Sequence, residues 1–573
     1  MDFCILQINK TAVMKNITLI LIAVLLTALF SCDNSGTDKQ NELADFSDSL
    51  IINAENLIGL RFDTAEYNQM QGFLKRNLSN YEQMRVYSLD NSVAPALLFQ
   101  PLINADEKPG QEYSNPVPVS EVQLPGNDEE IAFLTVEQLS QLIRNGDLSS
   151  VELTRIYLDR LKKYGDSLYC VVSITENLAL EQAERADREI AEGNYRGPLH
   201  GIPYGVKDLL AVEGYKTTWG AKPYENQVID QTATVVQKLE EAGAILVAKL
   251  SMGALAMGDV WFGGISRNPW NPEQGSSGSS AGSASATAAG LVAFSIGTET
   301  LGSIVSPSTR CGVTGLRPTF GRVSRAGAMA LCWSMDKIGP LCRSADDCAL
   351  VFDVIRGPDG IDRTVIDKAF NYNFNIDIKK LKIAYLEKEF KGKYENQSND
   401  LEVLSVFNKM GVDLIPIEME FGDIPLRSLR IILYAEAAAA FDELTRSGLD
   451  SLLTAQEEGS WPNTFRSARF IPAVEYIQAN RYRTMLMERM EQIMKDYDVI
   501  ITPSFKGNQL LVTNLTGHPC VVVPNGFNEE NSPTSICFIG NLYDEASILL
   551  AASKYQEATE FDEMHPPLFF NEK

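Results

Sequence analysis

Histidine and recognisable metal-binding motifs are scarce in this sequence. Only three histidines, His200, His518 and His565, occur among 573 residues, which argues against a multi-histidine metal site. No two cysteines have the CxxC spacing that is typical of structural zinc sites. We therefore expect no metal and no cofactor, and we expect proton transfer to depend on side chains other than imidazole.

Signals for binding nucleotides or nucleic acids are also missing. The sequence contains neither a GxxxxGK[ST] phosphate loop nor a GxGxxG motif after a strand-like segment. The 50 Lys and Arg residues are outnumbered by 75 Asp and Glu residues, so the net charge is −25. Because nucleic-acid phosphates require a basic surface, the composition predicts no nucleic-acid partner.

The sequence has one long apolar run, and it lies near the N-terminus. "ITLILIAVLLTALF", Ile17 to Phe30, follows Lys10 and Lys15. At ~1.5 Å per residue the run spans ~21 Å, less than the ~30 Å hydrocarbon core of a bilayer. It therefore favours the central region of a secretory signal peptide. An uncleaved hydrophobic anchor is the alternative, and Met14 would be a more typical start than Met1.

"LFSC", which ends at Cys32, resembles the lipobox of bacterial lipoproteins. The resemblance implies that residues 1–31 are a signal peptide and that Cys32 is lipidated. We expect the body of the protein to lie outside the cytoplasm, anchored by lipid to a bacterial membrane, in the periplasm or at the cell surface.

The rest of the chain divides by composition. Residues 32–44 are polar and predict a tether, while 45–127 combine helical periodicity with a Pro-rich stretch, as expected of a helical extension and a wrapping arm. We place the main domain at 128–573. Its cysteines are odd in number, which does not suggest a disulfide framework. We expect buried free thiols at Cys170, Cys311, Cys332, Cys342, Cys348, Cys520 and Cys537.

Short apolar runs alternate with helical patterns through the main domain. "GIPYGVKDLLAV", "AILVAKL", "KIAYL", "DVIITPS" and "PCVVVPNGF" resemble strands, and helices with caps at Thr135 and at Ser149 or Ser150 precede them. This alternation predicts an α/β fold with a largely covered sheet.

Lys207 stands out because it lies inside one of these apolar runs, "GPLHGIPYGVKDLLAVEG". A lysine in a desolvated pocket loses basicity and can act as a general base near neutral pH. The alternative is an edge residue whose amine reaches water.

Two runs of small and hydroxyl residues follow, "QGSSGSSAGSASATAAG" and "SIGTETLGSIVSP". A flexible linker is one explanation, but the apolar residues after the first run favour a helix that begins near Ser283. Gly278 to Gly282 also match GxSxG, the nucleophile elbow of α/β-hydrolases. That elbow requires a preceding strand, which "RNPWNPEQGSS" does not predict.

These runs, together with "GPLHGIPYGVKD", "RCGVTGLRPTFGRVSR" and "MDKIGPLCRSADDCALVFD", resemble the amidase signature family. The resemblance covers roughly residues 133 to 560. It implies that fold, a large mixed central β-sheet covered on both sides by helices. It also implies an enzyme that hydrolyses linear amides, with a small-molecule or peptide amide as substrate and a monomer or homodimer as the assembly.

By position, the resemblance implies a catalytic triad of Ser303 as nucleophile, Ser279 as bridging serine in a cis peptide, and Lys207 as base. The backbone N–H groups of Thr300, Leu301, Gly302 and Ser303 would form the oxyanion hole. The "GTETLGSI" spelling is closest to a branch that includes bacterial peptide amidases.

Some positions depart from the family spelling. Glu299, Leu301 and Val305 replace Asp, Gly and Arg, and Ser277 and Ala281 stand where glycine is usual. If the position of Leu301 requires a positive φ, the oxyanion loop is distorted, and the chain is a catalytically impaired lipoprotein that binds an amide ligand. A third hypothesis is the glutaminase subunit of a tRNA amidotransferase, which the export signal and the acidic charge argue against.

Overall fold

The computed structural model describes residues 46–86, 89–102 and 121–570. The predicted signal peptide, the lipidation site Cys32 and the predicted tether lie outside these residues. The chain divides into two compact units, Met1–Ser88 and Leu89–Lys573. In the residues that the structure describes, no helix has both the length and the hydropathy needed to cross a bilayer.

In residues 46–86, which are the described part of the first unit, the chain forms α2 (Asp48–Ile58) and α3 (Thr64–Met84), as the periodicity predicted. Asp63 caps α3 through a capping box with Glu66. The hydroxyl of Tyr67 donates a hydrogen bond of 3.1 Å to the carboxylate of Glu55, which joins the two helices.

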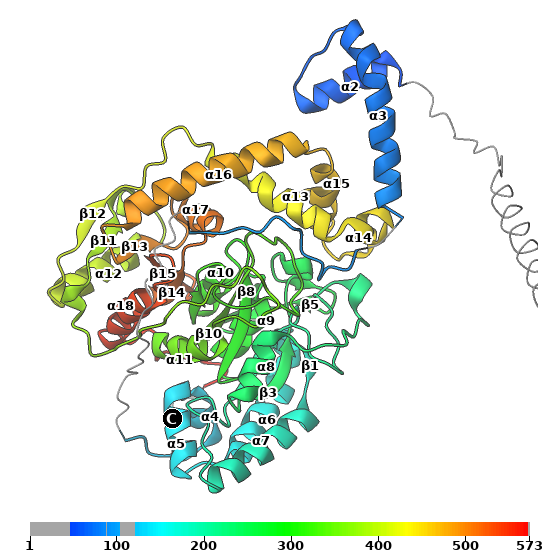
Figure 1. The fold of residues 1–573 in the computed structure, drawn as a ribbon. Helices are drawn as coiled ribbons and strands as arrows, with labels where there is room; N and C mark the ends of the chain where they lie inside the picture. The colour runs from blue at the N-terminus through cyan, green and yellow to red at the C-terminus, as the bar shows by residue number, and fades with distance from the viewer. Residues whose placement is uncertain (1–45, 87–88, 103–120, 571–573) are drawn as a thin grey trace, which may run out of the picture. The chain divides into compact units, whose positions relative to one another are not determined.

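The second unit is built on an eleven-stranded mixed sheet in the order β1-β3-β2-β8-β10-β9-β14-β15-β13-β11-β12, with helices on both sides (Figure 1). Strand β2 runs parallel to β3 and β8, and β11 runs parallel to β12 and β13, while the other neighbours are antiparallel. This confirms the predicted α/β fold. The strands are β1 (Val171–Ile174), β2 (Pro203–Lys207), β3 (Ile245–Leu250), β8 (Phe294–Glu299), β9 (Thr314–Arg317), β10 (Lys337–Cys342), β11 (Ile383–Leu386), β12 (Ile415–Ile417), β13 (Val499–Pro503), β14 (Cys520–Phe527) and β15 (Pro533–Gly540).

The helices of this unit begin largely where the sequence predicted. Thr135 caps α5 and Ser149 caps α6, each through a capping box. The α-helices are α4 (Asp128–Phe133), α5 (Val136–Asn145), α6 (Ser150–Leu168), α7 (Glu176–Ala191), α8 (Thr234–Glu241), α9 (Ala281–Ala288), α10 (Val305–Cys311), α11 (Ala345–Ile355), α12 (Gln397–Lys409), α13 (Ile431–Ala440), α14 (Asp442–Arg446), α15 (Trp461–Ala468), α16 (Ala473–Met494), α17 (Gln509–Thr516) and α18 (Glu545–Glu557).

Two short hairpins lie outside the main sheet, β4 (Val260–Trp261) with β5 (Gly264–Ile265), and β6 (Arg267–Asn268) with β7 (Asn271–Gly275). The second hairpin corrects the sequence analysis, which predicted no strand before the first serine run. Two asparagine side chains, Asn268 and Asn271, make the turn by accepting backbone N–H groups two residues on. Because Pro and Asn are depleted in strands, the propensities of this stretch do not reveal the two short strands that flank the turn.

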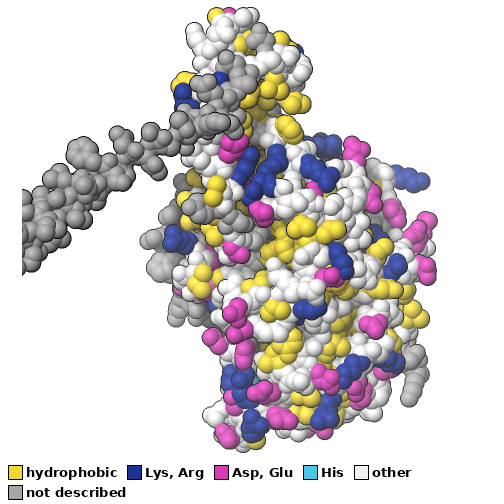
Figure 2. Space-filling view, turned by 90° about the vertical axis from the view of Figure 1, so that its right-hand side faces the viewer, with side chains coloured by type: hydrophobic (Ala, Val, Ile, Leu, Met, Phe, Trp, Pro, Cys, Tyr) yellow, Lys and Arg dark blue, Asp and Glu magenta, His cyan; other side chains and the backbone are white. Residues whose placement is uncertain are grey.

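The interior of the second unit is closely packed and holds all seven cysteines of the main domain. Each is buried and unpaired, which confirms the prediction of free thiols. On the face shown in Figure 2, acidic and basic side chains are interspersed with hydrophobic ones.

Candidate active site

Lys207 is the last residue of β2, which lies between β3 and β8 in the sheet. Its side chain is fully buried, so the alternative of an edge lysine that reaches water is wrong. The Nζ atom lies 2.9 Å from Ser279 Oγ, 2.9 Å from Thr298 Oγ1 and 3.1 Å from Ser280 Oγ. Three hydroxyl groups therefore surround an amine that is shielded from solvent.

This burial changes the acid–base behaviour of Lys207. Loss of solvation lowers the pKa of its amine from 10.5 to about 7, and the nearby charges of Asp336 and Glu299 oppose only part of that effect. An amine with this pKa is about half neutral at pH 7. The site therefore holds a base that can accept a proton near neutral pH.

Ser279 follows a cis peptide bond, Gly278–Ser279, as the resemblance implied. A side chain at Gly278 is excluded because its Cβ would lie 1.8 Å from the carbonyl oxygen of Gly258. The preceding residue, Ser277, has a φ of 60°, and its N–H donates to Asp259 at 2.9 Å. Of the departures from the family spelling, Ser277 is thus one that occupies a backbone conformation favouring glycine.

Ser280 is the serine of the GxSxG match, and the structure gives it a different role. Its hydroxyl accepts from the backbone N–H of Thr298 and lies within 3.1 Å of the Thr298 carbonyl oxygen, to which it donates. It also contacts Lys207. The group is fully buried and engaged in bridging two backbone segments, so the nucleophile-elbow hypothesis is wrong.

Ser303 lies on the loop between β8 and α10 and is 7% exposed. Its carbonyl oxygen accepts from the N–H of Ser280 at 3.2 Å, which joins the two serine runs. Its hydroxyl donates no hydrogen bond to any other residue that the structure describes. Nor do the N–H groups of Thr300, Leu301, Gly302 and Ser303 donate to any described residue. This turn therefore presents unpaired donors next to an unpaired hydroxyl.

The distortion considered for Leu301 does not arise, because the positive φ of this loop falls on the next residue. Gly302 has a φ of 87°, whereas Leu301 is absent from the residues with positive φ. Leu301 packs part of its side chain against the core. The leucine is therefore compatible with the loop conformation.

The buried carboxylate of Glu299 holds the loop that carries Ser303 in place, a role that the sequence analysis missed. One carboxylate oxygen accepts the N–H groups of Ile304 and Val305 at 2.9 and 3.0 Å. The other accepts from Arg317 and Asn514, both at 2.8 Å. Burial alone would raise the pKa of Glu299, but the charge and hydrogen bonds of Arg317 outweigh it and lower the pKa to about 2. One indication of this role was available in the sequence, because Glu299 is the only acidic residue in the run of small and hydroxyl residues "SIGTETLGSIVSP".

A second buried ion pair lies behind the lysine. Asp208 follows Lys207 directly and contacts Lys249 Nζ at 3.0 Å, with neither side chain exposed. Asp208 also accepts from the N–H of Thr218 at 2.8 Å. Lys249 lies within the apolar run "AILVAKL", and a lysine in such a run could have been recognised from the sequence as a buried charge. The pair anchors the end of β2 and so holds the base in position.

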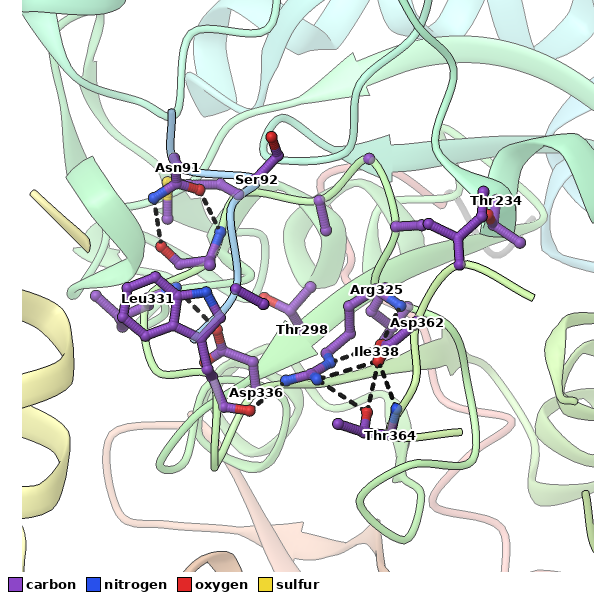
Figure 3. Close-up of a pocket in the computed structure, with 18 of the residues that line it drawn as sticks. Asn91, Ser92, Thr234, Thr298, Arg325, Leu331, Asp336, Ile338, Asp362 and Thr364 are labelled. Atoms are coloured by element: carbon purple, nitrogen blue, oxygen red, sulfur yellow. Dashed lines mark hydrogen bonds and ion pairs between the residues drawn. The ribbon is translucent and has the colours of Figure 1, made fainter. Parts of the chain in front are cut away.

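A cavity of about 740 Å³ lies next to Thr298, although Lys207, Ser279 and Ser303 themselves are not among its lining residues (Figure 3). Thr298 and Thr300 form part of its wall, and Thr298 is the residue whose hydroxyl contacts Lys207. The Thr300 hydroxyl donates to Asp336 at 2.6 Å. Met252 and Leu255 are fully buried core residues and do not line this cavity. Among the described residues, no three His, Cys, Asp or Glu side chains are grouped as a metal site requires.

Comparison with known proteins places this architecture among relatives. A family model described as Amidase matches residues 152–549. A glutamyl-tRNA(Gln) amidotransferase subunit of Coxiella burnetii (strain RSA 493 / Nine Mile phase I) is 34% identical over 484 residues, which are 76% of this chain and 99% of that protein.

Solved structures give the same result. The native peptide amidase of Stenotrophomonas maltophilia is 26% identical, with a TM-score of 0.67 over 75% of this chain and 98% of its own. An amidase family protein from Bacillus anthracis str. Ames is 25% identical, with a TM-score of 0.68 over 77% of this chain and 93% of its own. The family model and the identity over most of the chain show that this chain belongs to the amidase family.

Proposed function

We propose that the protein hydrolyses a carboxamide through an acyl-enzyme, with Ser303 as nucleophile, Ser279 as bridging serine and Lys207 as base. The observation that carries this proposal is the desolvated amine of Lys207, hydrogen-bonded to Ser279 at 2.9 Å. A neutral amine next to a relay hydroxyl is the arrangement that activates a serine without histidine.

The proposed steps conserve atoms and protons. Neutral Lys207 takes the hydroxyl proton of Ser279 as Ser279 takes that of Ser303, and the Ser303 oxygen bonds to the amide carbon. The carbonyl electron pair moves to oxygen, where the unpaired N–H groups of residues 300–303 stabilise the charge. Collapse breaks the C–N bond, and the proton returns through Ser279 to the departing nitrogen. Water then cleaves the ester by the same relay.

The identity of the substrate determines the leaving group and the acyl group, and two observations support different substrates. The likeness to a peptide amidase structure supports a peptide or other small amide. The relatives named as subunits of glutamyl-tRNA(Gln) amidotransferase support a second candidate, in which the amide is glutamine and the chain works with partner proteins. The net charge of −25 and the predicted export signal favour the first candidate.

The test uses the protein without residues 1–32, with Ser303→Ala as control. Ammonia or amine release is measured for peptide amides, aryl amides, fatty amides and glutamine, and both proteins are treated with a fluorophosphonate probe. We expect labelling and turnover in the wild type and neither in Ser303→Ala. A folded wild type that neither labels nor turns over would favour the amide-binding lipoprotein, although Leu301 no longer supports that alternative. Turnover of glutamine alone would favour the amidotransferase candidate.

We also propose export and lipid anchoring at Cys32, which rest on the sequence alone. Incorporation of radiolabelled palmitate into the full chain tests them, with Cys32→Ala as control. Equal labelling of the two proteins, or none, would contradict the anchor.

A further inference from the structure

The segment Leu89–Leu102, here called the strap, lines the cavity although it lies outside the residues that match the family model. It belongs to the second compact unit and contains neither helix nor strand. Its residues Asn91, Ser92 and 94–99 form one wall. Figure 3 shows Asn91 and Ser92 at this wall, across from Arg325 and Asp362.

Both ends of the strap are fixed to the body of this unit. The side-chain amide of Asn91 donates to the carbonyl of Ala330 at 2.9 Å and accepts from the N–H of Ala330 at 2.7 Å. At the other end, the ring of Phe99 packs edge-on against Phe320 at 5.0 Å, and the guanidinium of Arg483 lies 3.5 Å from its centroid. The strap is therefore held in place at the cavity.

Between these ends the strap presents exposed apolar side chains. Leu97 is 79% exposed and Leu98 is 50% exposed, and both line the cavity. Other parts of the cavity wall add further apolar residues: Met329, Leu331, Trp333 and Ile338. Apolar side chains of the strap and of residues 329–338 therefore line a cavity whose wall also includes Thr298 and Thr300.

Of the five charged side chains of the cavity wall, Arg325, Asp336 and Asp362 are engaged within the protein, Lys337 donates to the carbonyl of Met335, and Arg363 is exposed. Arg325 contacts Asp362 at 2.9 Å, and its remaining donors bond to Thr364 and to the carbonyl of Trp333. The carboxylate of Asp336 accepts from Thr300, as described, and from two backbone N–H groups. Arg325, Asp336 and Asp362 are therefore not free to pair with a charged substituent, whereas Leu97 and Leu98 offer exposed apolar area.

We propose that the strap is a specificity element that selects amides carrying a bulky apolar group. Leu97 and Leu98 cover this apolar group when the amide enters the cavity. The inference rests on the proposed amidase function and names its substrate class. A cavity of about 740 Å³ accommodates an alkyl or aryl group of the size that small-molecule sites bind.

The test compares the wild type with the double variant Leu97→Asp/Leu98→Asp, both without residues 1–32. The control is Leu449→Asp/Leu452→Asp, two leucines of another short segment that are 46% and 51% exposed and do not line the cavity. Ammonia release is measured for acetamide, hexanamide and octanamide. We expect kcat/KM for octanamide to fall at least about tenfold in the strap variant and to remain unchanged for acetamide. The control variant should keep the wild-type ratio.

An unchanged ratio of octanamide to acetamide in the strap variant would overturn the inference, as would an equal change in the control. If no amide is hydrolysed, the proposed function fails, and calorimetry on Ser303→Ala decides the inference separately. Octanamide binding to Ser303→Ala that is lost when Leu97→Asp/Leu98→Asp is added would support it. Absence of binding to Ser303→Ala would overturn it.

Discussion

The pKa of Lys207 determines how the proposed reaction depends on pH. The base accepts a proton only when neutral, so kcat/KM for an uncharged amide should rise with pH and level off above the pKa. With the pKa lowered to about 7, the midpoint lies near pH 7. Below it the rate should fall about tenfold per pH unit, to about 1% of the plateau at pH 5.

The size of this effect follows from burial. A lysine with the ordinary pKa of 10.5 is neutral in only about one molecule in three thousand at pH 7, whereas the buried amine is neutral in about half. A solvated Lys207 would therefore place the midpoint above pH 10 and leave the enzyme nearly inactive at neutrality.

Two variants separate Lys207 from other groups. Lys337 is also buried with a pKa lowered to about 7, mainly by burial, but no contact joins it to Ser279, so Lys337→Met should keep the midpoint. The charge of Asp336 raises the pKa of Lys207, so Asp336→Asn should move the midpoint to lower pH. The measurement is kcat/KM from pH 5 to 9.5, together with the rate of fluorophosphonate labelling.

A flat profile over this range, or a midpoint that moves with Lys337→Met and not with Asp336→Asn, would refute the assignment of Lys207 as the base. Circular dichroism at each pH would show whether any loss of rate below pH 6 reflects unfolding.

Three further predictions concern the serine runs and the loop beneath Ser303. Ser279→Ala should lower kcat by about 10² to 10⁴-fold with the fold intact, whereas Ser280→Ala should mainly lower the free energy of unfolding, by about 1–2 kcal/mol. Kinetics and urea titrations of both variants check this. Equal losses of kcat in the two variants would contradict it. Glu299→Gln leaves Arg317 buried without its counter-charge and should destabilise the protein by about 3–5 kcal/mol in urea unfolding; a loss under 1 kcal/mol would show that the pair is not needed. Ser277→Gly relieves a positive φ and should raise the free energy of unfolding by up to about 1 kcal/mol, and a lower melting temperature would mean that the hydrogen bond between the Ser277 and Ser306 hydroxyls outweighs that relief.

The sequence predicted most of the fold because its signals are local. Alternating apolar runs marked β2, β3, β11, β13 and β14, and capping residues marked the starts of α5 and α6. The order of strands in the sheet was not predictable in this way, because β14 pairs with β9 through Cys520 and Arg317, about two hundred residues apart. Such pairings depend on three-dimensional packing that no short pattern encodes.

The residues of the candidate site could likewise be predicted only in part. Lys207 stood out because it lies in an apolar run, whereas the positions of Ser279 and Ser303 came from the resemblance to the family, and the catalytic roles of all three stay predictions. The supports of the site, Glu299 with Asn514 and Asp208 with Lys249, could not be assigned, because each pair joins residues distant in sequence. The concern over Leu301 came from assigning a positive φ to the wrong residue of the loop, which only backbone geometry reveals.

The hydrogen bond between Glu299 and Asn514 also has a consequence for synthesis. Lys207, Ser279 and Ser303 are synthesised long before residue 514. A nascent chain therefore contains all three while it still lacks Asn514, whose side chain donates a hydrogen bond to the Glu299 carboxylate. The strand pairing of β9 with β14 waits for the same late residues. The order of translation thus delays assembly of the site until nearly the whole chain has emerged, and truncated products would carry the three residues without the finished loop.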